Sequence, residues 1–245
     1  ITSVGSTMQI TSALKMVSAA KLKRAQDAIT QMRPYAEKLQ EILGNLSATL
    51  DLSENAYSEA REVKNVLIVA VSSNRGLCGG FNNNIIKKVN HLVQNDFKGA
   101  NPKILCLGKK VKDAFKRSEF YYSNEALSEA EDIFYDLTFD ANAKIAEELM
   151  ERFLNKEFDQ VVVVYNQFVN AAVQHVQVEQ MLPIVPTVQE GAAAGDYIFE
   201  PSKAEIVEDM IPKSLKIKLF KGLLDSHASE HGARTVSNTH LRDHE

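Results

Sequence analysis

The run Asn65-Val66-Leu67-Ile68-Val69-Ala70-Val71 decides the fold class of this chain. Every residue after Asn65 is apolar, which is the pattern of a strand that is covered on both faces. The run Val161 to Tyr165 has the same character. Such strands are typical of a small, mostly parallel sheet with flanking helices, so the middle of the chain is predicted to be an α/β domain.

Short apolar runs alternate with amphipathic stretches after this strand, as in repeated strand and helix units. The pattern predicts helices at residues 83–96, 109–117 and 141–155 and strands at residues 103–107 and 160–165. Residues 172–182 alternate apolar and polar side chains, which favours an antiparallel edge strand. A turn of small residues at 191–195 and a short strand at 197–199 are expected to follow.

The first sixty residues follow a helical period instead. Their apolar positions alternate spacings of three and four, as in a coiled-coil seam: Leu22, Ala25, Ile29, Met32, Ala36, Leu39, Leu43, Leu46 and Leu50. A second apolar face recurs every fourth residue: Val207, Ile211, Leu215, Leu219 and Leu223. The two segments are predicted to pair as an antiparallel coiled coil around the inserted sheet domain; packing of the first helix on its own domain is the alternative.

Prolines interrupt both predicted helices, at Pro34 and Pro212. A proline inside a helix removes one backbone hydrogen bond and clashes with the preceding turn. A kink or local break is therefore expected near Arg33.

Composition narrows the class of protein. The chain has 245 residues, with 44% hydrophobic and 24% charged residues, as in an ordinary globular protein. No apolar run approaches the roughly 18 to 20 residues of a membrane-spanning helix. A net charge of -4 and the lack of tryptophan argue against a nucleic-acid-binding surface. Cys78 and Cys106 form neither a disulfide framework nor a zinc cluster, which favours a reducing compartment.

The stretch Ser72-Ser73-Asn74-Arg75-Gly76-Leu77-Cys78-Gly79-Gly80-Phe81 is a glycine-rich turn between a strand and a helix. Backbone amides in such a place can bind phosphate, although the string fits neither the dinucleotide-binding nor the P-loop pattern. A tight turn that needs glycine for its backbone conformation is the simpler interpretation. A free-standing nucleotide-binding α/β enzyme is the alternative.

His227-Ala228-Ser229-Glu230-His231 matches the HxxEH string of some zinc proteases. No third ligand is evident, and two solvated histidines on an exposed helix face are the simpler interpretation. Neither Cys78 nor the acidic residues around Glu129 have the neighbours that a nucleophile or an acid/base pair requires. The sequence therefore predicts no catalytic residue, no metal site and no cofactor.

The first helix is basic in an acidic protein. Its bases are Lys15, Lys21, Lys23, Arg24, Arg33 and Lys38, against the acids Asp27 and Glu37. The interleaved alanines favour close contact with an acidic protein partner. Nucleic acid, anionic lipid and a merely solvated face are the alternatives.

Four strings resemble the gamma subunits of F-type ATP synthases: residues 10–26, Arg33-Pro34-Tyr35, residues 72–81 and residues 228–234. The resemblance implies a central rotor whose two long helices form an antiparallel coiled coil inside a ring of three alpha and three beta subunits. The α/β domain would lie outside that ring, against the epsilon subunit and the c-subunit ring. Such a subunit does no bond chemistry; it transmits torque and takes part in regulating ATPase activity and proton flow. A coiled-coil adaptor without a role in ATP synthesis is a further alternative.

The same resemblance implies a location and a set of contact residues. The protein would be peripheral on the cytoplasmic side of a bacterial inner membrane, with indirect membrane contact and no nucleic-acid partner. The implied coupling and subunit-contact residues are Ile10, Leu14, Lys15, Met16 and Val17 in the shaft, Arg75 and Gly76 near an acidic lever loop of beta, and Phe199 and Glu200 in the foot.

The resemblance also divides the chain. It implies a shaft helix at 1–60, an α/β foot domain at 61–201 and a second shaft helix at 202–235. Residues 236–245 do not resemble the family, so we expect a shortened C-terminal helix followed by a foreign tail.

Overall fold

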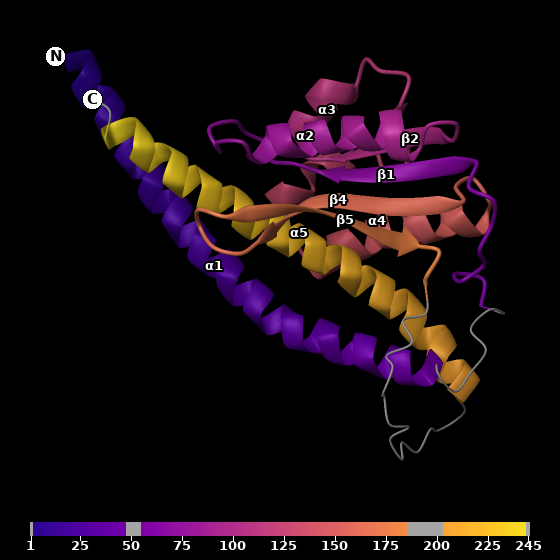
Figure 1. The fold of residues 1–245 in the computed structure, drawn as a ribbon. Helices are drawn as coiled ribbons and strands as arrows, with labels where there is room; N and C mark the ends of the chain where they lie inside the picture. The colour runs from indigo at the N-terminus through magenta and orange to yellow at the C-terminus, as the bar shows by residue number, and fades with distance from the viewer. Residues whose placement is uncertain (1, 48–54, 186–202, 244–245) are drawn as a thin grey trace.

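A long helical pair and an α/β domain make up the structure, a computed structural model that describes residues 2–47, 55–185 and 203–243 (Figure 1). The helices of the pair are α1 (Thr2–Ser47) and α5 (Lys203–Asp243). The domain contains β1 (Asn65–Val71), α2 (Phe81–His91), η2 (Leu92–Asp96), β2 (Asn101–Leu107), α3 (Lys109–Phe115), β3 (Tyr121–Tyr122), η3 (Ala130–Tyr135), α4 (Phe139–Leu154), β4 (Gln160–Phe168) and β5 (Gln174–Leu182). The predicted α/β fold is confirmed.

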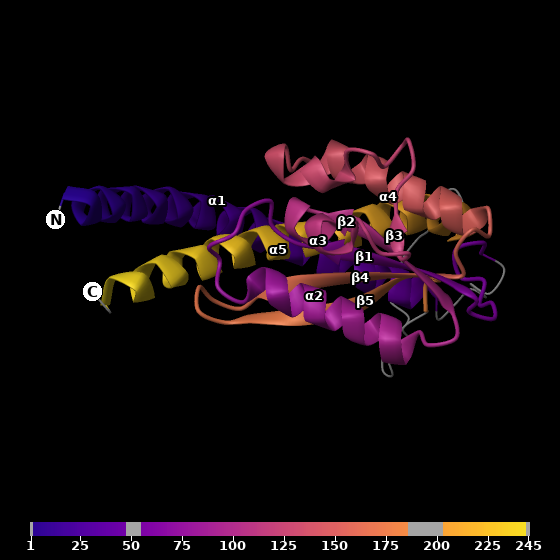
Figure 2. The same ribbon diagram turned by 90° about the horizontal axis from the view of Figure 1, so that it is seen from above.

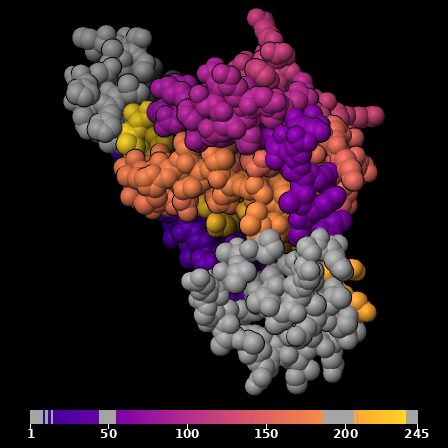
Figure 3. Space-filling view, turned by 45° about the vertical axis from the view of Figure 1, so that its right-hand side comes forward, coloured from indigo at the N-terminus to yellow at the C-terminus, as the bar shows by residue number. Residues whose placement is uncertain are grey.

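The sheet has the strand order β3-β2-β1-β4-β5 and is parallel except for β5, which pairs antiparallel with β4 at the edge, as predicted. Alternate residues of β1 point to opposite faces. Leu67 and Val69 pack in the core with α4 and α5, whereas Val66 and Ile68 pack with α2 and α3. Figure 2 shows the sheet between α4 and α2, and in Figure 3 the edge strand β5 (orange) lies at the surface between α2 and the long helices. Coverage on both faces explains why β1 is apolar throughout.

The two long helices run antiparallel and project together from one end of the domain, where the N-terminus of α1 lies near the C-terminus of α5 (Figure 1). Leu22 and Ala25 of α1 form one apolar cluster with Ala228 of α5. Ile29 forms the next with Phe220 and other residues of α5. The seam predicted from the helical period is therefore confirmed in this part of the pair.

The periodic face predicted for the C-terminal helix packs elsewhere than expected. Leu215, Leu219 and Leu223 of α5 lie in the main core with α4 and the sheet, and of α1 only the end at Ile42 and Leu43 packs against this core among the described residues. The residues that meet α1 come from the neighbouring face of α5, such as Phe220 and Leu224. Helix α5 is therefore apolar on two faces, because it separates α1 from the domain, and a single four-residue period describes only one of them.

The prolines do not interrupt the helices. Pro34 lies inside α1 and Pro212 inside α5, and both helices continue across them, so the break expected near Arg33 is not present. Helix α1 instead curves gently along the domain (Figure 1). Helix α5 extends to Asp243, past residue 235, where it was predicted to end.

Other elements differ from the predictions in smaller ways. The short elements β3 and η3 were not predicted, because neither is long enough to display a period. The turn and strand predicted at 191–199 lie outside the described residues. Among the described helices, none has both the length and the apolar character that crossing a membrane requires.

An ion pair with one fully buried partner joins the two long helices to the sheet. The Arg33 guanidinium on α1 donates to Asp225 Oδ1 of α5 at 3.1 Å and to the carbonyl of Phe168 at the end of β4 at 3.3 Å. The same carboxylate oxygen accepts from the Phe168 amide at 3.2 Å. The Asp225 side chain is fully buried and the Arg33 side chain is 38% exposed. One carboxylate thereby fixes α1, α5 and β4 relative to one another.

Replacing Arg33 with alanine is expected to lower the free energy of unfolding at pH 7 by about 2 to 3 kcal/mol, because a buried carboxylate loses its counter-ion. Burial already raises the pKa of Asp225. The variant should regain part of the loss as pH falls toward 4.5, since the folded state then binds a proton before the unfolded chain does. Urea unfolding at both pH values measures this effect.

The control is Lys23→Ala, which removes the exposed pair of Lys23 with Asp27 at 3.7 Å. We expect it to cost less than about 0.5 kcal/mol. An equal loss in the two variants would contradict the special role of the Arg33 pair.

Candidate functional site

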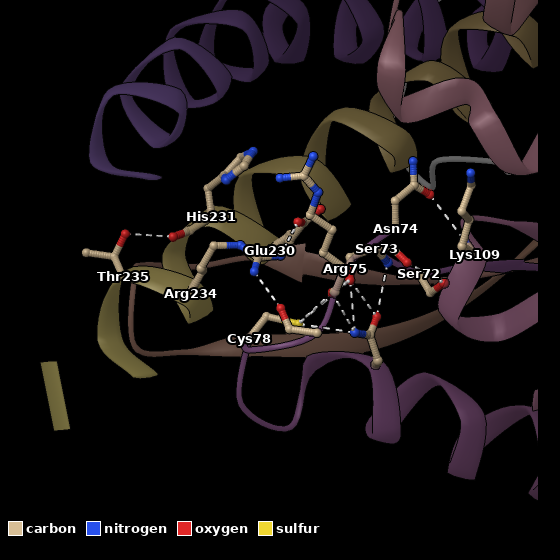
Figure 4. A network of polar contacts seen from close by, with 12 residues as sticks. Ser72, Ser73, Asn74, Arg75, Cys78, Lys109, Glu230, His231, Arg234 and Thr235 are labelled. Atoms are coloured by element: carbon tan, nitrogen blue, oxygen red, sulfur yellow. Dashed lines mark hydrogen bonds and ion pairs between the residues drawn. The ribbon is translucent and has the colours of Figure 1, made fainter. Parts of the chain in front are cut away.

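The glycine turn, Ser72–Phe81, joins β1 to α2 at the carboxyl edge of the sheet. The side chain of Asn82 closes it: its Oδ1 accepts from the Ser73 amide at 3.0 Å, and its Nδ2 lies 3.2 Å from Cys78 Sγ. The Ser73 hydroxyl donates to the carbonyl of Arg75 at 2.5 Å (Figure 4). Polar side chains therefore hold the turn from its inner side, while Arg75 is exposed.

The same turn caps the start of α3. Ser72 Oγ accepts from the amide of Val111 at 2.9 Å, and Asn74 Oδ1 accepts from the amide of Lys109 at 3.1 Å. With the Ser73 amide also bonded to Asn82, these three donors are committed to protein acceptors. The polar side chains of the turn therefore serve to join it to α2 and α3.

Gly108 allows this close approach of β2 and the turn. Its φ is +112°, and a Cβ atom there would lie 2.1 Å from the carbonyl oxygen of Ser72. Gly108→Ala is therefore expected to destabilise the protein by about 3 kcal/mol, from the contact and the backbone strain together. Thermal or urea unfolding measures the loss.

Gly99→Ala provides a matched control, since Gly99 has a φ of +97° and open space around its Cβ position. Only the backbone strain applies there, so about 1 kcal/mol is expected. Equal losses at the two positions would mean that the contact with Ser72 does not matter.

Helix α5 contacts the turn through Arg234. The Arg234 guanidinium donates to the carbonyl of Gly76 and pairs with Glu230 Oε1 at 2.6 Å (Figure 4). Burial raises the pKa of Glu230, whereas the charges of Arg234, Lys21 and Arg75 act to lower it. The charges of Lys21 on α1, Arg75 in the turn and Arg234 on α5 thus all act on one buried carboxylate, and we call these three residues the basic cluster.

Exposed apolar side chains lie close to this basic cluster in the sequence. Met16 is 66% exposed and Val17 54% exposed on α1, and Leu77 at the turn is 65% exposed. Lys23 and Arg24 on α1 are exposed as well. An apolar and basic surface of this kind suits a protein partner that offers apolar contacts and carboxylates.

The structure describes the remaining predicted contact residues to different extents. Ile10 and Leu14 belong to α1, but their side chains are not among those described, and Lys15 is half-buried. Phe199 and Glu200 lie outside the described residues. Their roles in subunit contact stay predictions.

Sequence reasoning did not single out two of the residues that build this site. Asn82 closes the turn and Arg234 holds it from α5. An amide side chain in the first turn of α2 and a Glu–Arg pair spaced four apart were the available signals. Neither pattern predicts the distant contact, because Arg234 and Gly76 are 158 residues apart in the chain.

The two cysteines are unsuited to nucleophilic chemistry. Both thiols are buried. Burial raises the pKa of Cys78 and raises that of Cys106 to about 12. Both side chains therefore stay protonated at neutral pH and act as small apolar residues.

The histidines of the HxxEH string are not solvated, contrary to the prediction. His231 is buried, His227 is half-buried, and their rings lie 4.6 Å apart. His227 also stacks on Phe134 at 5.8 Å. Burial, with a smaller effect of the charge of Lys21, lowers the pKa of His227 to about 4. Burial, followed by the effects of His227, Lys21 and Arg234, lowers the pKa of His231 to about 3. Over the part of the chain that is described, no three His, Cys, Asp or Glu side chains are grouped as a metal site.

These histidines are expected to make stability depend on pH. Unfolded imidazoles bind protons near pH 6.5, whereas those of His227 and His231 do so only near 4 and 3 in the folded state. Stability should therefore fall as pH drops below about 6.5, by up to about 1.4 kcal/mol per pH unit for each histidine. Unfolding measured from pH 7.5 to 4.5 tests this slope.

Replacing both histidines with leucine should flatten that slope, because the proton uptake of the unfolded chain at these positions is removed. His175→Gln, at an exposed position of β5, is the control and should leave the slope unchanged. A wild-type slope retained in the double variant would show that other groups cause it.

The structure combines a sheet domain with two paired helices that extend beyond it. Their surface is basic and apolar, which is typical of a subunit that binds other proteins. A family model described as ATP synthase matches residues 1–239. The ATP synthase gamma chain of Christiangramia forsetii is 57% identical, over 99% of this chain and 86% of that protein. The gamma chain of Flavobacterium johnsoniae is 56% identical, over 97% of this chain and 82% of that protein. The chain therefore belongs to the ATP synthase gamma-chain family.

A solved structure has the same fold. A chain in the central stalk and c-ring structure of Tetrahymena thermophila mitochondrial ATP synthase superimposes with a TM-score of 0.66, covering 95% of this chain and 99% of that chain. The sequences are 21% identical, so this likeness concerns the arrangement of helices and sheet.

Proposed function

We propose that this chain is the central rotor subunit of a rotary ATP synthase and transmits torque between a membrane c ring and a catalytic ring of alpha and beta subunits. The observation that carries the proposal is the pair of arms, which pack along a buried seam and continue beyond the domain (Figure 1). A paired helix resists bending and twisting better than a single one, so rotation of the domain would turn the arms with it. Such rotation would bias the catalytic sites among their conformations and thereby influence ATPase activity and proton flow.

The proposed partners are three alpha and three beta subunits around the arms, and the epsilon subunit and c ring at the domain. Lys23, Arg24 and Arg75 are exposed basic residues of α1 and the turn. They support the inference that the ring surface in contact with them is acidic. We assign Ile10, Leu14 and the residues 15–17 to contact with the ring. Phe199 and Glu200 are assigned to contact with epsilon and the c ring, on the strength of the family resemblance.

The proposed location is the cytoplasmic side of a bacterial inner membrane, as a peripheral subunit whose membrane contact is indirect. The bacterial gamma chains with which this chain shares more than half of its residues support this location.

Reconstitution tests the proposal. Mixed with purified alpha and beta subunits, the chain is expected to form a complex in a ratio of one to three and three, and to raise ATP hydrolysis above that of the alpha and beta subunits alone. Tight nucleotide binding by the isolated chain, without assembly, would instead favour the enzyme alternative.

Charge reversal at the turn tests the contact assigned to Arg75. Arg75→Glu is expected to weaken assembly by about tenfold or more, because a carboxylate would then face an acidic partner surface. Titration of labelled chain with alpha and beta subunits measures the affinity. Arg117→Glu reverses an exposed charge just after α3 and is expected to leave it within about twofold; similar losses in both variants would indicate a net-charge effect.

A further inference from the structure

A pocket of about 460 Å³ lies between the two long helices and the edge strand of the sheet. It forms where the C-terminal half of α1, the end of β5 and the N-terminal half of α5 come together, at the end of the domain away from the projecting arms (Figure 1). Small-molecule sites in proteins commonly have volumes of about 300 to 1,000 Å³ and a mostly apolar lining with a few polar groups. The pocket has the size of such a site.

Most of the lining is apolar. The apolar side chains come from both helices and from the segment that follows β5: Leu39, Leu43, Ile184, Val185, Ile211 and Leu215. Leu39, Leu43 and Ile184 are only half-buried, and Val185 is 67% exposed. Apolar surface is therefore open to solvent in the pocket, and an alkyl chain that covered it would be favoured by roughly 25 cal/mol for each Å².

Two lysines of α5, Lys218 and Lys221, bring positive charge to the same pocket. Glu179 is the acidic residue of the lining, and its Oε1 accepts from the hydroxyl of Tyr165 at 2.6 Å. Lys218 Nζ donates to the carbonyl of Gln180 at 2.6 Å, which leaves it further N–H donors. Desolvation lowers the pKa of Lys218, the charge of Glu179 raises it, and the charge of Lys221 lowers it. An anion bound near both ammonium groups would offset their mutual repulsion.

The charged and apolar parts lie at different levels of the pocket. Ile211 and Lys221 are about 15 Å apart along the axis of α5, at about 1.5 Å per residue. Leu43 of α1 packs against the core that contains Ile211, so apolar side chains gather at that end. The pocket is therefore amphipathic along its length, apolar toward Ile211 and cationic toward Lys221.

We propose that this pocket binds an alkyl carboxylate, such as a fatty-acid anion, with its chain toward Ile211 and its carboxylate at Lys218 and Lys221. Two lysines and one glutamate leave a single excess positive charge in the lining, which one carboxylate balances. The ligand would contact α1, α5 and the end of β5 together, so its binding would stabilise their packing. The proposal concerns a ligand site and does not depend on the rotor function.

Calorimetric titration of the whole chain with decanoate, below the concentration at which decanoate forms micelles, tests the proposal. We expect one site per chain and a Tm that rises with the ligand concentration. Decanol has the same chain without the charge, and decyltrimethylammonium has the opposite charge. Each is expected to bind at least about tenfold more weakly than decanoate, because the lysines then have no anion to pair with.

Lys218→Gln removes one charge and keeps a donor for the carbonyl of Gln180. It is expected to weaken decanoate binding by about fivefold to tenfold and decanol binding by less than about twofold. Lys213→Gln is the matched control, because Lys213 is an exposed residue of the same helix that pairs with Asp209 outside the pocket lining. It should leave both affinities within about twofold.

Ser214→Leu tests the place of the alkyl chain, because Ser214 lines the pocket and a larger side chain there would occupy its space. It is expected to weaken decanoate and decanol binding alike. Equal binding of decanoate and decanol, an unchanged affinity in Lys218→Gln or Ser214→Leu, or an equal loss in Lys213→Gln would overturn the proposal. Competition by vesicles of anionic phospholipid would overturn it as well, in favour of a lipid head-group site. Assembly with alpha and beta subunits is measured without these amphiphiles, so the ligand site and the rotor function can fail separately.

Discussion

Helix α5 has to satisfy two packing partners at once, and the rest of the structure depends on this constraint. One face places Leu219 and Leu223 in the core of the domain, and the adjacent face places Phe220 and Leu224 against α1. A turn of α5 about its axis would therefore expose apolar surface on both sides, at roughly 25 cal/mol for each Å². The arm is not attached to the domain by a hinge, because the helix that forms half of the arm is also a layer of the domain core.

Polar contacts fix where α5 sits along its axis. The Asn142 side chain of α4 donates to the carbonyl of Lys216 at 2.8 Å, and the hydroxyl of Ser229 donates to the carbonyl of Asn166 at 3.0 Å. The Arg33–Asp225 pair adds a third point. Apolar packing alone tolerates sliding by a helical turn, whereas a buried hydrogen bond made at the wrong level leaves a donor or acceptor unsatisfied. The domain and the base of the arms therefore form one stiff body, which suits a part that must transmit rotation.

The sequence predicted the helices and strands of this fold better than it predicted which of them pack together. The bounds of β1 agree with the structure, and the edge strand β5 was expected from alternation alone. The apolar face of α5 was recognised, but it was assigned to α1, whereas it packs mainly on α4 and the sheet. Pro34 was expected to kink or break its helix, and α1 continues across it. The histidines His227 and His231 were expected in solvent and are enclosed between α5 and its neighbours.

Local physics explains this division. Strand alternation, helical period and glycine in turns depend on backbone geometry within a few residues, so the sequence by itself determined the element types, the α/β class and the strings that mark the family. The site depends on contacts between distant residues, such as Arg33 with Asp225 and Arg234 with Gly76, which are 192 and 158 residues apart. Only the tertiary structure decided these pairs, and with them the exposure of Leu77. The local sequence of a helix face or a turn does not determine which distant residues pack against it.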